Sequence, residues 1–405
     1  MSYCKAKTLK ISCIVFIGFF LFGIFAFFPQ SVQALNNVVA TIPTIPSPEN
    51  IAITPNGAYA YVTNWYSNWT TVISTASNAV TARITVGGNP WAVAITPDGA
   101  YAYVTNANNG TVSVISTVSN TVIATIIVGS KPYGLAITPN GAYVYVTNAD
   151  SGTVSRISTA TNSVIATITL GTRPTSVAIT PDGSFAYVTN VNSGTVSVIS
   201  TASNAVTSTI IVGGKPWAVS ITPNGAYAYV TNGIVSVIST ASNTVTATIN
   251  VGTAYFGVAI TPNGQYAYVT NFGSASVSVI NTVTNTLTLV VAVGSDPSGV
   301  AITPNGAYAY VTNYLDNTVS VININSNLTS ITVTSGGSYY TTPHILLVGG
   351  GGSGATAVAR VSQGVIIGIV LTNPGNGYTS APTVVIRDPS PRAKGASATI
   401  NYGTP

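Results

Sequence analysis

Seven aromatic or basic residues occur singly or in close pairs at intervals of about 40 residues, most of them beside a proline. Aromatic rings stack on planar or apolar faces and attract cations, whereas lysine and arginine pair with acidic groups. A rim made of such side chains would bind a glycan or an acidic peptide. The alternative is that the rings fill an internal channel and the basic groups are only solvated. The predicted rim residues are Trp91, Lys131, Tyr133, Arg173, Lys215, Trp217 and Phe256.

A second set of candidates lies in the segment "NWYSNWT". There Trp65, Tyr66 and Trp69 make one loop more aromatic than its counterparts, and we expect them to be exposed. Glycosylation sequons begin at three asparagines, although such matches arise easily by chance in a chain rich in Asn and Thr. The candidate glycosylation sites are Asn68, Asn109 and Asn327.

Residues suited to catalysis or metal binding are scarce. The single histidine, His344, has no cysteine or carboxylate near it in the sequence, and both cysteines, Cys4 and Cys13, lie close to the N-terminus. Asp98 and Asp182 simply replace the asparagine of a repeated turn. We therefore predict no catalytic residue, no metal site and no cofactor.

A long repeat must position the rim residues. The segment "ITPNGAYAYVTN", Ile53 to Asn64, returns seven times in steps of 42 residues, except for one step of 39. A fixed period of this size is typical of a repeat architecture. The proline of each copy is at Pro55, Pro97, Pro139, Pro181, Pro223, Pro262 and Pro304.

Each repeat contains four short runs rich in β-branched and aromatic residues, such as "WAVAIT", "AYAYVT", "TVSVIS" and "TVIATIIV" in the second copy. Runs of this kind predict strands. Pro-Asn/Asp-Gly predicts a hairpin between the first two strands, and Asn232-Gly233 in the shortened repeat predicts a hairpin between the next two. Four strands per repeat predict an all-β fold: a seven-bladed β-propeller with a small C-terminal Gly-rich all-β module.

The repeated "AYAYVTN" segment alternates large and small side chains. Tyr59, Tyr61 and Thr63 would share one face of the strand, and Ala60 and Val62 would share the other. We expect the tyrosine face of each blade to pack against the alanine face of the next.

The ring must also close between its last and first blades. Residues 38–42 match the fourth strand of a repeat, so we expect them to complete the blade that begins near Ser298 and to cover its edge. The competing segment is Leu328–Val333. The propeller would span residues 35–327, and residues 328–405 would form a separate Gly-rich β module with two internal repeats, marked by "YTTP" at Tyr340 and "YTSAP" at Tyr378.

Residues 1–34 combine three lysines, an apolar run and a small-residue cleavage pattern, which predicts a signal peptide cleaved before Leu35. An uncleaved N-terminal anchor is the alternative. Without this segment the chain carries nine Lys and Arg against seven Asp and Glu. Near neutrality argues against a nucleic-acid partner and favours self-association. Membrane contact would come only through the N-terminal segment, if that segment is retained.

The seven "YVTN" copies, from Tyr61 to Tyr310, resemble the YVTN-type β-propeller repeats of surface-layer proteins in archaea and bacteria. The resemblance covers Val38 to about Asn325 and implies a secreted or cell-surface propeller for adhesion or protein contacts, with no catalytic residues. The expected partner is a cell-envelope protein or glycan. The alternatives are a propeller enzyme of lyase or lactonase type, which would need a cluster of histidines and acids in the channel, and a periplasmic protein that binds a small anion.

Overall fold

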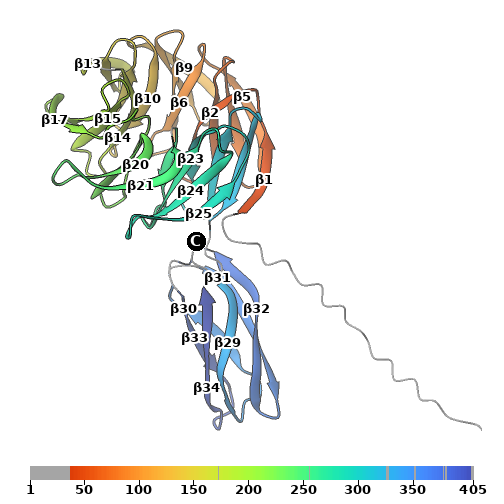
Figure 1. Cartoon of the computed structure of the whole chain (residues 1–405). Coiled ribbons are helices and arrows are strands. Elements are labelled where there is room, and N and C mark those ends of the chain that lie inside the picture. The colour runs from red at the N-terminus through yellow and green to blue at the C-terminus, as the bar shows by residue number, and fades with distance from the viewer. Residues whose placement is uncertain are drawn as a thin grey trace, which may run out of the picture. The chain divides into compact units, whose positions relative to one another are not determined.

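The structure is a computed structural model that describes residues 37–171, 173–254, 256–324, 328–350, 353–376, 378 and 381–402. Every element in these ranges is a strand, and Figure 1 shows the strands arranged as a ring of blades and one further sheet. The predicted signal peptide and Asn327 lie outside the described residues. No helix in the described ranges has the length and apolar character needed to cross a membrane.

Seven four-stranded antiparallel sheets form the ring, which confirms the predicted fold class. Blades 1 and 2 consist of β2 (Pro48–Ile53), β3 (Tyr59–Asn64), β4 (Trp69–Ser74) and β5 (Ala79–Thr85), and of β6 (Pro90–Ile95), β7 (Tyr101–Asn106), β8 (Thr111–Ser116) and β9 (Thr121–Ile127). Blades 3 and 4 consist of β10 (Pro132–Ile137), β11 (Tyr143–Asn148), β12 (Thr153–Ser158) and β13 (Ser163–Thr169), and of β14 (Pro174–Ile179), β15 (Phe185–Asn190), β16 (Thr195–Ser200) and β17 (Ala205–Ile211). Blades 5 and 6 consist of β18 (Val219–Ile221), β19 (Tyr227–Thr231), β20 (Gly233–Ser239) and β21 (Thr244–Ala254), and of β22 (Val258–Ile260), β23 (Tyr266–Asn271), β24 (Ser276–Asn281) and β25 (Thr286–Ala292). Blade 7 consists of β26 (Pro297–Ile302), β27 (Tyr308–Asn313), β28 (Thr318–Asn323) and β1 (Asn37–Pro43).

The N-terminal strand β1 is the outermost strand of blade 7, where it pairs antiparallel with β28. The ring is thus closed by strands from both ends of the propeller sequence. Across this closure the Tyr310 hydroxyl donates a hydrogen bond to Asn78 Oδ1 of blade 1 at 2.7 Å. The competing segment that begins at Leu328 belongs to the other sheet.

The hairpin between the first two strands of a blade follows from its "TPNG" sequence. In blade 1 the Thr54 hydroxyl donates to Asn56 Oδ1 at 2.7 Å, and the same oxygen accepts the backbone N–H of Ala58. Gly57 has φ 73°, a conformation that costs glycine little. The predicted roles of asparagine and glycine in this turn are therefore present in the structure.

The tyrosine of the repeated "YVTN" segment joins neighbouring blades. Tyr61 is 1% exposed and packs against Ala102 and Val104 of blade 2. In six copies the hydroxyl donates to an asparagine of the next blade at 2.6–3.3 Å. Burial raises the pKa of Tyr61 to about 12, so the phenol stays neutral. The prediction that Tyr59 shares this packing is wrong: its side chain is 43% exposed, because it stands at the start of the strand beyond the reach of the next blade.

The threonine of the same segment makes a second link between blades, near the centre of the ring. In six copies its hydroxyl donates to a backbone carbonyl at the start of the next blade, at 2.7–3.1 Å. Five acceptors lie in the first strand of that blade, and Trp217 lies two residues before β18. The acceptor residues are Trp91, Tyr133, Thr175, Trp217, Ser298 and Glu49. The repeated motif therefore fixes the backbone that carries the residues next to the channel.

Replacing Thr105 by valine should destabilise the ring by about 1–3 kcal/mol. Valine has nearly the same volume as threonine but cannot donate a hydrogen bond, so the carbonyl of the buried Tyr133 loses the donor that Thr105 supplies. Chemical denaturation would measure the change. Thr125→Val on the exposed face of β9 is the matched control and should stay within about 0.5 kcal/mol of the parent. Equal effects at the two positions would contradict the assigned role.

The remaining described strands form one six-stranded sheet in the order β33-β30-β31-β32-β29-β34. Their bounds are β29 (Leu328–Ser338), β30 (His344–Val348), β31 (Ser353–Ser362), β32 (Val365–Asn376), β33 (Thr383–Arg387) and β34 (Lys394–Tyr402). Equivalent strands of the two sequence repeats pair with each other, β30 with β33 and β29 with β32. Tyr340 and Tyr378 are both buried in the core of this six-stranded sheet. The carboxylate of Asp388 accepts hydrogen bonds from the backbone N–H groups of Thr341 and Thr342.

Candidate functional site

The candidate site is built from one position that occurs once in each blade, at the entrance to the first strand. The backbone around this position is held by the threonine bonds described above, yet the residue type changes from blade to blade. Beta strands that enter a propeller side by side bring such equivalent positions to one end of the channel. In blade order the residues are Glu49, Trp91, Tyr133, Thr175, Trp217, Phe256 and Ser298.

The aromatic members of this set form a continuous cluster. The ring centroids of Trp91 and Tyr133 are 4.6 Å apart, those of Trp91 and Trp217 are 6.0 Å apart, and those of Trp217 and Phe256 are 5.1 Å apart. Trp65 from the loop between β3 and β4 joins the cluster edge-on, 4.7 Å from Trp91. The structure thus brings together four predicted rim residues and one residue of the predicted exposed loop.

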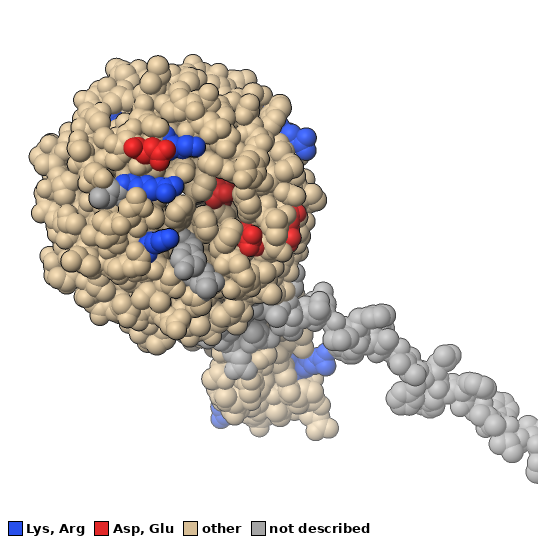
Figure 2. Space-filling model, turned by 45° about the horizontal axis from the view of Figure 1, so that its top comes forward, with Lys and Arg blue, Asp and Glu red and all other residues tan. Residues whose placement is uncertain are grey.

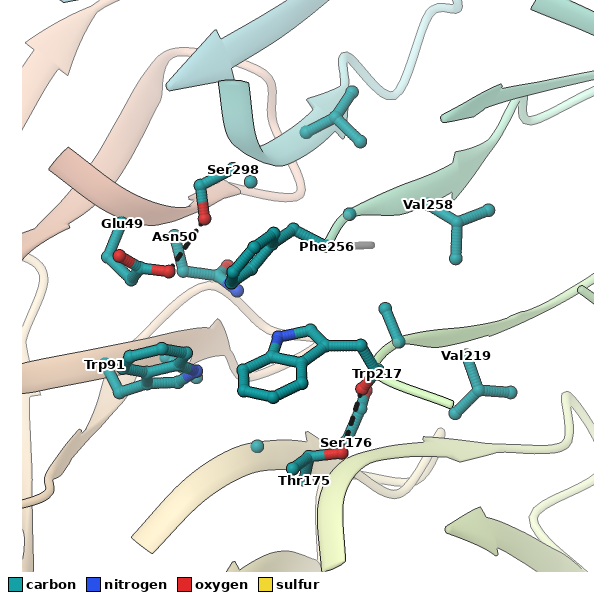
Figure 3. A pocket seen from close by; sticks show the side chains of 16 residues that line it. Glu49, Asn50, Trp91, Thr175, Ser176, Trp217, Val219, Phe256, Val258 and Ser298 are labelled. Carbon is teal, nitrogen blue, oxygen red and sulfur yellow. Dashed lines mark hydrogen bonds between the residues drawn. The ribbon is translucent and has the colours of Figure 1, made fainter. Parts of the chain in front are cut away.

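A cavity of about 170 Å³ lies beside these rings (Figure 3). Six of the seven equivalent residues line it, and Tyr133 instead contacts the cluster from outside the cavity. Trp91, Trp217 and Phe256 are half-buried, so their rings neither fill the space nor lie fully in solvent. The alternative in which the aromatic rings plug the channel is therefore only partly realised.

Glu49 is the only residue with a formally charged side chain among the described residues that line this cavity. It is 5% exposed, and its Oε1 accepts a hydrogen bond from the Ser298 hydroxyl at 2.7 Å (Figure 3). Burial raises the pKa of this carboxyl group to about 7, and the bond from Ser298 only partly opposes that rise. A carboxyl group in this range changes its charge near neutral pH.

The three predicted basic residues precede the prolines of blades 3, 4 and 5. Arg173 and Lys215 are exposed, and Lys131 is half-buried with its Nζ 3.4 Å from Asn108 Oδ1. Lys131 and Arg173 adopt positive φ angles of 53° and 49°. Their carbonyl groups accept N–H bonds from the loop between the second and third strands, at Ala149 and Val191, so both loops belong to the same face.

Charged side chains are sparse on the propeller face shown in Figure 2. Several basic ones lie on one side with an acidic group beside them, and other acidic groups lie across the rest of the face. Lys131, Arg173 and Lys215 stand at equivalent positions of three successive blades, outside the set of residues that line the cavity. The face therefore combines an aromatic cluster with basic groups beside it.

The other predicted residues separate into different settings. Tyr66 is 73% exposed and Trp69 is 38% exposed, whereas Trp65 is partly buried in the aromatic cluster. Asn68 and Asn109 are both exposed, and the side chain of Asn109 accepts the backbone N–H of Gly88. His344 is exposed at the start of β30 in the C-terminal sheet. Asp98 and Asp182 each cap their own turn, and the hydrogen bond from the preceding threonine is the main cause that lowers the pKa of each.

Within the described ranges no three His, Cys, Asp or Glu side chains are grouped to hold a metal ion. Sequence reasoning missed Glu49, Thr175 and Ser298 as partners of the aromatic residues. The signal was present, since all three occupy the same repeat position as Trp91 and Trp217. Which of these residues line the cavity depends on how far each blade entrance reaches toward the axis, and the repeat pattern does not report this distance.

The fold and this channel site define the chain as a β-propeller protein. Among solved structures, a chain of Kuenenia stuttgartiensis hydrazine synthase is 26% identical, with a TM-score of 0.64, over 73% of this chain and 98% of that chain. The β-propeller domain of Cps50 (Swd1) from Myceliophteria thermophila is 10% identical, with a TM-score of 0.64, over 71% of this chain and 99% of that domain. No protein-family model matches the chain, and no curated protein matches it significantly.

Proposed function

We propose that this protein is a secreted or cell-surface, non-enzymatic propeller that serves as an envelope or adhesion module. Its ligand would be an acidic glycan, or an acidic segment of an envelope protein, bound on the face that carries the aromatic cluster. The observation that carries the proposal is the cluster itself, with half-buried rings of Trp91 and Trp217 and basic residues in three adjacent blades. Aromatic rings with nearby cations suit acidic sugars.

Binding of a soluble polyuronate, polygalacturonate, tests this function by isothermal titration calorimetry. Joint replacement of Lys131, Arg173 and Lys215 by alanine should weaken binding about tenfold or more, since each exposed ion pair contributes up to about 1 kcal/mol. Because these charged contacts are exposed to solvent, added salt should also weaken the binding of polygalacturonate by the parent protein.

Arg83→Ala is the matched control, because Arg83 is an exposed basic residue on the outer strand β5 of the ring. It should bind polygalacturonate as the parent does, and neutral dextran should bind neither protein. If the triple variant and Arg83→Ala lost equal affinity for polygalacturonate, the net charge of the protein would explain the loss, and a binding site on the rim would be contradicted.

A propeller enzyme that uses the channel is the second candidate, and Glu49 is the observation in its favour. A carboxyl group with a pKa of about 7 is suited to general acid or base catalysis. The hydrazine synthase chain named above also shows that a similar propeller occurs in an enzyme. The described cavity lining supplies no second titratable side chain to act with Glu49, so ligand binding is the better-supported function.

A further inference from the structure

The channel cavity combines a carboxylate with aromatic rings, and an anionic ligand on the rim leaves the carboxylate unused. Glu49 lies on one side of the cavity, and Trp91, Trp217 and Phe256 lie around the same space (Figure 3). The basic residues Lys131, Arg173 and Lys215 are not among the cavity-lining residues. The cavity and the rim therefore differ in the sign of the charge they present.

The carboxylate of Glu49 is only partly satisfied by the protein. One oxygen accepts the Ser298 hydroxyl, and the other has no hydrogen-bond donor among the described residues. The side chain as a whole is 5% exposed, yet this second oxygen is not among the buried polar atoms that lack a partner, so it is open to the cavity. A carboxylate in this setting favours a ligand that brings a compensating positive charge.

The aromatic rings favour a positively charged occupant. The face of an indole attracts a cation within about 6 Å of its centroid, and the attraction grows as water is excluded. Two indoles with centroids 6.0 Å apart and one phenyl ring 5.1 Å from the second supply such faces. The hydroxyl of Thr175 donates to the Trp217 carbonyl at 3.0 Å and so is occupied within the protein.

Size and ligand chemistry restrict the cation further. The cavity volume of about 170 Å³ is on the order of five times the roughly 30 Å³ of a liquid water molecule. Besides Glu49, the side-chain oxygens that line the cavity belong to Asn50, Thr175, Ser176 and Ser298, and Asn50 Oδ1 already accepts the backbone N–H of Ile51. A single carboxylate suits a monovalent cation better than calcium or magnesium, which prefer about six or more oxygen ligands. We propose that the channel cavity binds a small alkylammonium compound, with Glu49 as its counter-ion and Trp91, Trp217 and Phe256 as its aromatic walls.

Tetramethylammonium chloride is the probe, because it carries the charge without hydrogen-bond donors. Calorimetric titration at pH 8 should show saturable binding to the full chain, and Glu49→Gln should weaken it at least tenfold. Sodium chloride at equal ionic strength and tert-butanol, a neutral molecule of similar shape, should not bind. Absence of saturable binding, equal binding of tert-butanol, or unchanged affinity in Glu49→Gln would overturn the proposal.

Two further variants test the aromatic wall and the surroundings of the cavity. Trp217→Leu removes one aromatic wall and should weaken the binding of tetramethylammonium severalfold. This variant replaces Glu49→Gln as the test if Glu49→Gln fails to fold. Asp296→Asn removes a negative charge from the entering loop of blade 7, outside the cavity lining, and should leave binding unchanged. An equal loss in Asp296→Asn would contradict the cavity site. Glu49→Gln should still bind polygalacturonate, so failure of this inference and failure of the proposed function are distinguishable.

Discussion

Replacing Tyr61 by aspartate is expected to prevent the ring from folding, with a loss of roughly 4 kcal/mol or more in the free energy of unfolding. The side chain is 1% exposed and packs between Val72 of its own blade and Ala102 of the next. The variant removes an aromatic ring from this contact, deletes the hydrogen bond to Asn120 and leaves a carboxylate without a partner. Urea denaturation followed by circular dichroism would measure the loss.

Tyr59→Asp is the matched control, because it introduces the same charge two residues earlier on the same strand. Tyr59 is 43% exposed, so this variant should remain within about 1 kcal/mol of the parent. The claim that Tyr61 packs neighbouring blades together would be contradicted if Tyr61→Asp kept the parent's unfolding midpoint. Equal losses of stability in the two variants would contradict it as well.

Glu49→Gln should become progressively more stable than the parent as the pH rises from 4 to 8. The pKa of Glu49 is raised from 4.5 to about 7 in the folded protein. Below pH 4.5 both the folded and unfolded parent hold the proton, and the substitution has its pH-independent effect only. Between pH 4.5 and 7 the unfolded parent ionises first, so the parent loses stability while the glutamine variant does not.

The difference in unfolding free energy between variant and parent should therefore grow by about 3 kcal/mol between pH 4 and pH 8, at 1.36 kcal/mol for each pKa unit. Urea denaturation at both pH values would measure it. Asp98→Asn is the control, and its difference from the parent should stay nearly constant from pH 4 to pH 8. The bond from Thr96 lowers the pKa of Asp98 below its ordinary value of 3.8, so this carboxyl group is ionised in the folded and the unfolded protein over almost the whole range. A constant difference for Glu49→Gln across this range would mean that the carboxyl group is solvated.

The repeat carried most of the fold information. Four short apolar runs and a period of 42 residues are enough to predict the blades, because each run is too short for a helix and each turn contains Asn or Asp with Gly. The two tyrosines of "AYAYVTN" could not be distinguished in this way. Strand alternation places Tyr59 and Tyr61 on one face, but only the packed ring shows that the next blade covers Tyr61 alone.

The candidate site could be predicted only in part. Residue type singled out Trp91, Trp217 and the basic residues, since aromatic and cationic side chains have obvious binding chemistry. The residue type of Glu49 did not single it out, because one acid beside a proline is ordinary in a loop, and only its position in the repeat connected it with Trp91. Its raised pKa and its bond to Ser298 arise from ring closure, which brings together residues from blades 1 and 7.

The sameness of the repeated motif and the variation beside it have one physical explanation. The tyrosine and threonine of "YVTN" form bonds between blades, so a change in any copy would weaken the ring. At six of the seven blade entrances the residue is held through its backbone carbonyl, which leaves its side chain free to differ. Specific binding is therefore expected where the copies differ.

Tryptophan fluorescence tests this central claim most directly. The chain has four tryptophans, of which Trp65, Trp91 and Trp217 belong to the aromatic cluster, so the Trp69→Phe variant emits only from the site. Titration of this variant with polygalacturonate should change the emission saturably, at the concentrations at which calorimetry detects binding. If calorimetry detected binding of polygalacturonate while the tryptophan emission stayed unchanged, the ligand would bind away from the aromatic cluster, and the proposed binding site would be contradicted.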